Sequence, residues 1–176
     1  MGYRSGMRTE LTIRTAHVDD ASVLAAAERE IAAVPGQLVS RPEELVDERF
    51  AQKIAALGRA DNGRFLVAEV EGAIVGHGLL DPLPLAAVRH VVHLTLAVHP
   101  GWQGQGVGRA LLEALIEWAR AAPAVSKIEL HVRAPNERAR ALYRAVGFVE
   151  AGRWRRRVEV APGEYVDDIS MDLLVK

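Results

Sequence analysis

Apolar residues recur along this chain with two different spacings, which predict two kinds of element. Short runs rich in apolar residues, several of them alternating with polar ones, predict strands. The expected strands are residues 11–14, 65–70, 73–80, 89–98, 127–132, 148–160 and 165–174. In residues 107–121, apolar side chains instead recur three and four positions apart, as on one face of a helix. The pattern therefore predicts a chain that mixes strands and helices.

Residues that begin or end helices place the remaining helical segments. Asp20 can cap an Ala-rich helix, Pro42 is favoured in a first helical turn, and Gly147 suits a left-handed helix end. The expected helices are residues 20–33, 42–57, 107–121 and 136–146. The order of elements is strand, two helices, three strands, helix, strand, helix and two strands. This order predicts one α/β domain over residues 1–176 with a mixed sheet.

Turn residues define how some strands connect. Glu71-Gly72 lies between two expected strands and predicts a tight hairpin. Pro162-Gly163 predicts the turn between the last two strands. In residues 81–84, two prolines should interrupt the strand ladder, because proline has no N–H to donate.

Composition excludes several classes of function. The chain has no cysteine, which excludes disulfides, thiolate metal sites and a cysteine nucleophile. Its net charge of −1 argues against a dedicated nucleic-acid-binding protein. No run approaches the roughly 20 apolar residues of a membrane span, so no membrane partner is expected. Residues 1–7 lack the apolar core of a secretory signal, and a cytoplasmic protein is the default expectation. We expect residues 1–8 to be disordered, and Met7 is an alternative start.

The segment between an expected strand and helix, residues 98–109, is rich in glycine. Three alternating glycines, Gly104, Gly106 and Gly108, let backbone N–H groups turn toward one point, and the helix adds the positive end of its dipole. These features suit a phosphate or pyrophosphate. The segment lacks the lysine of a P-loop and the G-x-G-x-x-G of a dinucleotide fingerprint. A plain glycine-rich turn is the alternative.

A second motif follows the next expected strand. Asn136 and Tyr143 are seven positions apart, about two helical turns, so they share one helix face. That face can present an amide and a phenol to one groove. Alternatively, Asn136 only caps the helix and Tyr143 only fills the core.

Together the two motifs identify a family. Q-x-x-G-x-G at residues 103–108, followed by N-x-x-A-x-x-L-Y-x-x-x-G-F at residues 136–148, resembles the GNAT superfamily of acyl-CoA-dependent N-acyltransferases. The resemblance covers residues 94–148. It implies a single-domain α/β fold with a mixed, mostly antiparallel central sheet and helices on both faces. Residues 163–168 and Arg89-His90 also resemble bacterial members that acetylate small amino compounds, including amino acids.

The resemblance also implies which residues contact acetyl-CoA, the co-substrate. Asn136 would contact its arm, and Tyr143 would act near its sulfur as the acid for the leaving thiolate. Tyrosine suits this role because its ordinary pKa of ~10 keeps it protonated at neutral pH. Backbone groups of the strand end would meet the pantetheine arm: Leu96, Ala97 and Val98. The glycine-rich loop would hold the pyrophosphate: Gln103, Gly104, Gln105, Gly106, Val107, Gly108 and Arg109.

The sequence does not single out one residue as the base that accepts a proton from the amine substrate. His131 stands where relatives that act on protein N-termini carry a glutamate, and its ordinary pKa of ~6.5 suits a base. His93 and Glu30 are rivals, and water can relay the proton instead. The two histidines can equally be half-buried sheet residues. His77, His90 and His99 lack metal-ligand spacing, so no metal is expected.

Residues 153–157, Arg-Trp-Arg-Arg-Arg, form the densest run of charge. The run can bind an acidic acceptor or the adenosine phosphates of the cofactor. We favour an edge strand whose charges block pairing with another sheet.

Three functions follow from the sequence. The first is acetylation of a small primary amine, such as an amino acid or an amine-bearing toxin or antibiotic, by direct transfer in a ternary complex. The second is acetylation of a protein N-terminus or lysine. The third is a non-catalytic acyl-CoA-binding regulator, against which Tyr143 argues because pure binding needs no phenol. A homodimer is the default assembly.

Overall fold

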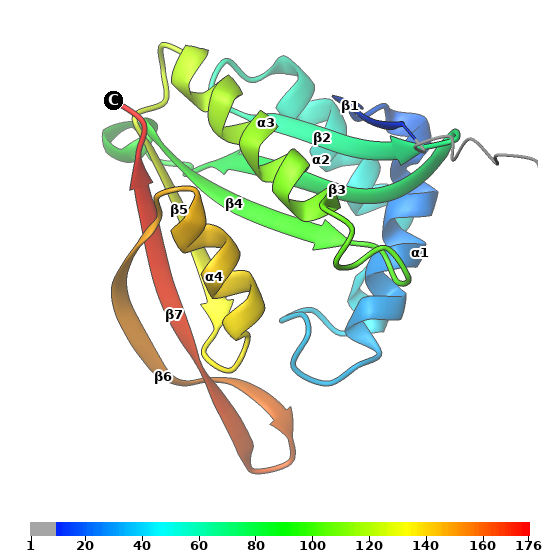
Figure 1. The fold of residues 1–176 in the computed structure, drawn as a ribbon, viewed down its shortest axis with the longest axis vertical. Helices are drawn as coiled ribbons and strands as arrows, with labels where there is room; N and C mark the ends of the chain where they lie inside the picture. The colour runs from blue at the N-terminus through cyan, green and yellow to red at the C-terminus, as the bar shows by residue number, and fades with distance from the viewer. Residues whose placement is uncertain (1–9) are drawn as a thin grey trace, which may run out of the picture.

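The computed structural model describes residues 10–176, in an α/β arrangement of one seven-stranded sheet and four α-helices (Figure 1). The strands are β1 (Leu11–Thr15), β2 (Arg64–Val70), β3 (Ala73–Pro82), β4 (Val91–Val98), β5 (Lys127–Arg133), β6 (Val149–Ala161) and β7 (Glu164–Leu174). The helices are α1 (Ala21–Ala32), α2 (Asp47–Arg59), α3 (Val107–Ala121) and α4 (Glu137–Ala145). Our expectations for residues 1–8 and Met7 lie outside the described residues.

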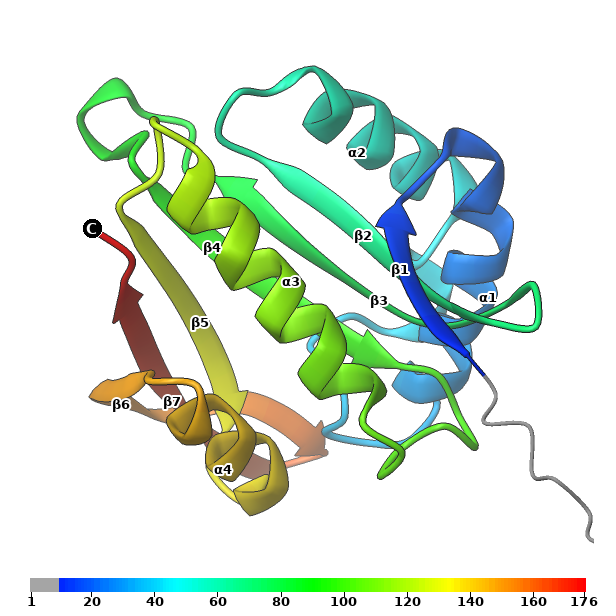
Figure 2. The same ribbon diagram turned by 45° about the horizontal axis from the view of Figure 1, so that its top comes forward.

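The sheet has the order β1-β2-β3-β4-β5-β7-β6. Every neighbouring pair is antiparallel except β4 and β5, which run parallel. Helices α1 and α2 lie on one face and α3 and α4 on the other (Figure 2). The predicted fold class, a mixed and mostly antiparallel sheet with helices on both faces, is confirmed. Within residues 10–176, no helix is both long and apolar enough to span a bilayer.

The two faces bury separate hydrophobic clusters. The larger cluster packs α3 and α4 onto the sheet and includes Leu111, Leu115 and Ile128. The smaller cluster packs α1 and α2 onto the β2 and β3 end of the sheet, around Leu24 and Phe65. Helix α3 buries one face with the predicted i, i+3, i+4 spacing. Of the expected stripe, Leu111 and Leu115 are buried, whereas Ala110, Ala114 and Trp118 are half-buried at its side.

Strands β4 and β5 pair over only three residues. Their register runs from Val91↔Lys127 to His93↔Glu129 and ends there, although β4 continues to Val98 and β5 to Arg133. Beyond His93 the two parallel strands diverge, which leaves a wedge-shaped opening in the sheet (Figure 1). Because strand pairing is interrupted here, backbone groups along one side of β4 are open to a ligand.

Three sequence expectations were wrong in detail. Residues 42–44 form a single 3₁₀ turn, and α2 begins at Asp47, because the side chain of Leu45 is buried and its backbone leaves the helical region. The interruption expected in residues 81–84 comes later than predicted, because β3 continues to Pro82: β2 begins at Arg64, opposite Leu80, so only β4 neighbours Pro82. A 3₁₀ turn over residues 86–88 delays the start of β4 from residue 89 to Val91.

Other expectations were right. Helix α3 spans residues 107–121 as predicted. The β2–β3 turn has positive φ at both Glu71 (51°) and Gly72 (81°), as a tight hairpin requires. Gly147, with φ 103°, follows the end of α4 in the expected left-handed conformation.

Candidate functional site

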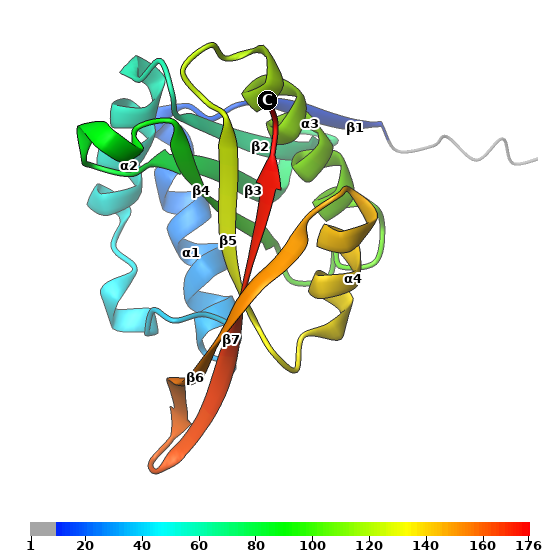
Figure 3. The ribbon, with the colours of Figure 1, turned by 90° about the vertical axis from the view of Figure 1, so that its left-hand side faces the viewer.

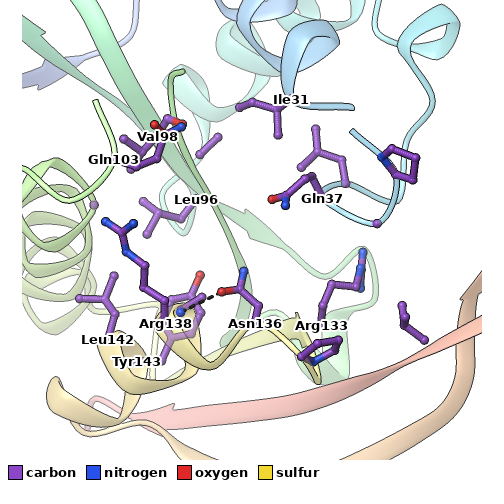
Figure 4. A pocket seen from close by; sticks show the side chains of 18 of the residues that line it. Ile31, Gln37, Leu96, Val98, Gln103, Arg133, Asn136, Arg138, Leu142 and Tyr143 are labelled. Carbon is purple, nitrogen blue, oxygen red and sulfur yellow. Dashed lines mark hydrogen bonds between the residues drawn. The ribbon is translucent and has the colours of Figure 1, made fainter. Parts of the chain in front are cut away.

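A cavity of about 1070 Å³ lies between the diverging end of β4, the start of α3, α4, the loop after α1 and the β6–β7 hairpin (Figure 4). One part of it, which we call the cofactor half, is lined by the predicted motif residues. These are Leu96, Ala97, Val98, Gln103, Gly104, Gly106, Gly108, Arg109, Asn136 and Tyr143. The structure thus brings together two motifs that are about 30 residues apart in the sequence.

The glycine-rich loop adopts the backbone that only glycine allows without strain. Gly101, Gly104 and Gly106 have φ of 84°, 83° and 86°, in the left-handed region. Gly106 is the N-cap of α3, so the unpaired N–H groups of the first helical turn and the positive dipole end lie beside the cavity. This arrangement has the features that suit an anion.

Side chains within the loop fix its shape. The amide of Gln103 donates to the carbonyl of Val98 at 3.1 Å, which ties the loop to the end of β4. The amide of Gln105 donates to the carbonyl of Gly101 at 2.9 Å and does not line the cavity. Val107 does not line it either, because its side chain is buried in the main core. These two side chains therefore support the loop from within.

Asn136 and Tyr143 both face the cavity from α4 (Figure 4). The Oδ1 atom of Asn136 accepts from the N–H of Ala139 at 3.0 Å, so the residue caps the helix and also lines the cavity. Tyr143 is 8% exposed and packs near the ring of Phe148. Burial raises the pKa of Tyr143 to about 12. Its hydroxyl therefore keeps its proton at neutral pH, as a proton donor must.

His93 and His131 lie close together but do not line the cavity. Their Nε2 and Nδ1 atoms are 3.3 Å apart, at the point where β4 and β5 stop pairing. His93 alternates with Val92 and Leu94, which pack in the main core, so its ring projects from the opposite face of the sheet. His131 also stacks at 4.2 Å on the ring of Trp154.

The surroundings of these two histidines favour their neutral forms. Burial lowers the pKa of His93, and the charge of His131 lowers it further. Burial is also the main cause that lowers the pKa of His131, while Asp168 raises it and Arg157 lowers it. Both rings are thus able to accept a proton at neutral pH. Glu30, the third candidate, is exposed on α1 and does not line the cavity.

The remaining walls form what we call the acceptor half of the cavity. Helix α1 contributes Ile31, the loop after it contributes Pro35, Gly36, Gln37 and Leu38, and the β6–β7 hairpin contributes Val160, Ala161, Glu164 and Val166. Figure 3 shows this hairpin extending beyond the end of β5. The two segments meet, because a Cβ on Gly36 would lie 3.0 Å from Cγ1 of Val160.

The acceptor half contains one buried ion pair that sequence patterns did not indicate. Arg133 lines the cavity, and its Nη1 donates to Asp168, whose side chain is 3% exposed. The two residues are register partners on β5 and β7. They are 35 positions apart, so only the strand pairing could have revealed their contact.

The arginine run lies on β6, which is an edge strand of the sheet as predicted. Arg153 donates to Asp167 at 2.7 Å, and Arg157 lies 4.7 Å from the ring centre of Trp154. None of residues 153–157 lines the cavity. No group of three or more His, Asp or Glu side chains in the described part of the chain is placed to hold a metal ion.

Comparison with known proteins adds independent findings. The family model described as "Acetyltransferase (GNAT) family" matches residues 26–148. The chain is 36% identical over 101 residues to the N-alpha-acetyltransferase RimI of Mycobacterium tuberculosis, covering 57% of this chain and 61% of that protein. It is 34% identical over 106 residues to the L-amino acid N-acetyltransferase AaaT of Escherichia coli, covering 58% and 62%. The matched segments thus span about three fifths of these curated relatives.

A solved structure agrees over a longer stretch. The ribosomal-protein-alanine N-acetyltransferase from Brucella melitensis superposes with a TM-score of 0.81 at 33% identity. The superposition covers 93% of this chain and 99% of that one.

Proposed function

This chain belongs to the acetyltransferase (GNAT) family, and we propose that it transfers the acetyl group of acetyl-CoA to the primary amine of a small molecule, such as an amino acid or an amine-bearing toxin or antibiotic. One observation carries the proposal. A glycine-rich loop at a helix N-terminus, an open strand edge and a buried phenol converge on one cavity. These three features would serve the pyrophosphate, the pantetheine arm and the thioester of acetyl-CoA.

The residues that line the cofactor half support acetyl-CoA as its ligand. The N–H groups from Gly104 to Arg109 would hold the pyrophosphate, and a Cβ on Gly104 would crowd the guanidinium of Arg138 at 3.1 Å. Arg109 and Arg138 both line the cavity and add positive charge near this anion. The open edge of β4 at residues 96–98 would bind the pantetheine arm, with Asn136 opposite.

Direct transfer needs a proton acceptor, an oxyanion donor and an acid. In the proposed reaction, the amine nitrogen bonds to the thioester carbon and the carbon–sulfur bond breaks. The ammonium proton goes to His131, with His93 beside it, through a relaying water, because neither ring lines the cavity. The backbone N–H of Val98 stabilises the oxygen. The thiolate takes the proton of the Tyr143 hydroxyl, and the second proton that the attacking nitrogen loses on forming the amide restores that hydroxyl. No covalent protein intermediate is needed when both substrates bind together.

A protein N-terminus is the second candidate acceptor. The relatives from Mycobacterium tuberculosis and Brucella melitensis, named for N-alpha and ribosomal-protein-alanine acetylation, favour it. The contact between Gly36 and Val160 favours a small molecule, because it narrows the acceptor half between the loop and the hairpin.

A competition between acceptors tests the proposal. Free thiol release from acetyl-CoA is followed with amino acids, small amines and peptides that have free N-termini. We expect kcat/KM for at least one small amine to exceed that for every peptide by tenfold or more. A higher kcat/KM for a peptide would indicate that the acceptor is a protein N-terminus and not a small amine. Acetyl-CoA binding without thiol release for any acceptor would indicate a regulator.

A further inference from the structure

A line of hydrogen bonds crosses the interior from α1 to the start of the glycine-rich loop. Oε1 of Glu28 on α1 lies 2.8 Å from Nε2 of His77 on β3. Nδ1 of His77 lies 3.0 Å from Nε2 of His99, and Nδ1 of His99 lies 3.0 Å from the carbonyl of Ile74. His77 is 0% exposed and His99 is 6% exposed. No motif of the sequence and no step of the proposed reaction uses these residues.

The hydrogen bonds have a fixed direction. The carbonyl of Ile74 can only accept, so Nδ1 of His99 donates to it. Burial, with a further contribution from the charge of His77, lowers the pKa of His99 to about 4, so its Nε2 carries a lone pair at neutral pH. Nδ1 of His77 must then donate to His99. The Nε2 atom of His77 then faces the carboxylate of Glu28, with one hydrogen bond between them at 2.8 Å.

At one end of this line, His99 lies at the start of the glycine-rich loop. His99 directly follows Val98, the last residue of β4, and precedes the glycine-rich segment. Its N–H donates to Val75 at 3.0 Å, and its carbonyl accepts from Trp102 at 3.1 Å. Every polar group of His99 is therefore bonded, which fixes the direction in which the loop leaves the strand.

At the other end of this line, Glu28 lies on α1, close to residues that line the acceptor half. Glu28 lies one helical turn before Ile31, which lines the cavity. His77 is the cross-strand partner of Ala97, which lines the cofactor half. The rings of Phe50 and Phe65 pack against His77. In such apolar surroundings a buried polar network destabilises the fold unless every member is bonded. Every ring nitrogen of this network has a partner, so the network can hold α1, β3 and the start of the glycine-rich loop in fixed relative positions.

We propose that His77 is a positioning residue for the cofactor, which joins α1 to His99 and so holds the glycine-rich loop in its pyrophosphate-binding shape. The inference rests on the proposed function only in taking acetyl-CoA as the ligand of that loop. Its test measures binding, so it does not depend on which amine is acetylated.

His77→Phe is the direct variant, because phenylalanine fits between Phe50 and Phe65 and removes both hydrogen bonds. We expect calorimetry to show about a tenfold loss of acetyl-CoA affinity. S-acetylpantetheine, which lacks the pyrophosphate, should bind within twofold of wild type when titrated by NMR. His77→Gln keeps an N–H donor and should recover most of the acetyl-CoA affinity.

Two variants of Glu28 separate geometry from charge. In Glu28→Gln the amide can donate to a neutral His77, so all the hydrogen bonds persist and acetyl-CoA affinity should stay within twofold. Glu28→Leu leaves a buried nitrogen without a partner and should weaken affinity several-fold. Glu48→Leu, at an exposed position on α2, is the matched control and should leave acetyl-CoA affinity unchanged.

Nitrogen-15 NMR of the imidazole rings gives a spectroscopic signature. In the wild type, Nδ1 of His99 should be protonated and Nε2 should not, and Glu28→Gln should leave His77 neutral with its proton on Nδ1. Unchanged acetyl-CoA affinity in folded His77→Phe would overturn the proposal. Equal losses for acetyl-CoA and S-acetylpantetheine would also overturn it, because they would indicate a general structural role. Failure to acetylate any amine, with these binding results intact, would count against the proposed function alone.

Discussion

The two halves of the cavity are built in different ways. The cofactor half is formed where β4 ends and where α3 and α4 begin. Most of its residues belong to the two short motifs that the sequence analysis identified. The acceptor half is formed by the loop after α1 and the β6–β7 hairpin, which are more than 100 residues apart in the chain. Under the proposed function, cofactor binding is thus encoded in two short sequence motifs, and the choice of acceptor depends on contacts between distant segments.

This difference leads to a testable expectation. Variants in the cofactor half should change binding of acetyl-CoA or the chemistry of transfer for every acceptor. Variants in the acceptor half should change the KM of particular acceptors and leave acetyl-CoA binding alone.

The largest expected effect is that of Tyr143→Phe, which removes only the hydroxyl oxygen. Packing against Phe148 is kept, so acetyl-CoA affinity should change little. Turnover should fall by about 10²–10⁴-fold, the usual contribution of general acid catalysis, and less if the thiolate departs with little assistance. Tyr165→Phe, an exposed tyrosine on β7, is the control. Full activity in Tyr143→Phe would exclude the acid role.

Gly106→Glu should weaken acetyl-CoA binding by well over tenfold, or about 1.4 kcal/mol or more. The new carboxylate would lie at the N-terminus of α3, where the pyrophosphate is proposed to bind. Gly106→Ala is the matched control, because it strains the same left-handed backbone without adding charge and has open space for its Cβ. Calorimetry on the folded variants measures both effects. Equal affinities for the two variants would mean that backbone strain, and not charge, is responsible.

His131→Gln should lower the rate about tenfold at neutral pH and remove the acidic limb of the pH–rate profile. A base acts only when neutral, so activity falls as pH drops through its pKa. Because burial lowers the pKa of His131 below its ordinary value of 6.5, wild-type activity should persist somewhat below that pH. Steady-state rates across pH measure this, with exposed His90→Gln as the control. If only His93→Gln moved the limb, the base would be His93.

The smallest effect is expected in the acceptor half, from Gly36→Ala. The added Cβ would meet Cγ1 of Val160 at 3.0 Å and force the loop and the hairpin apart. We expect a several-fold change in acceptor KM, because overpacking of this size costs about 1 kcal/mol, with acetyl-CoA affinity unchanged. Gly72→Ala adds similar backbone strain in a turn with open space and should have no effect on either constant.

The same division explains what the sequence could predict. The local backbone conformation explains why glycine stands at position 106 and asparagine at the helix cap, position 136. Such residues can therefore be interpreted from the sequence before the fold is known. The exact start of α2 was not readable, because it depends on the burial of Leu45. The contacts of Arg133 with Asp168, and of His77 with Glu28, depend on strands and helices far apart in the chain. They became visible only once the sheet order was known.

The most direct test of the central claim follows the acetyl group itself. Acetyl-CoA labelled with carbon-13 at the acetyl carbonyl is incubated with the protein and an equimolar mixture of small amines, and NMR follows the label. The account predicts that the label moves from the thioester into a secondary amide, in step with free thiol. A label that stays in the thioester, while calorimetry shows that acetyl-CoA is bound, would contradict it.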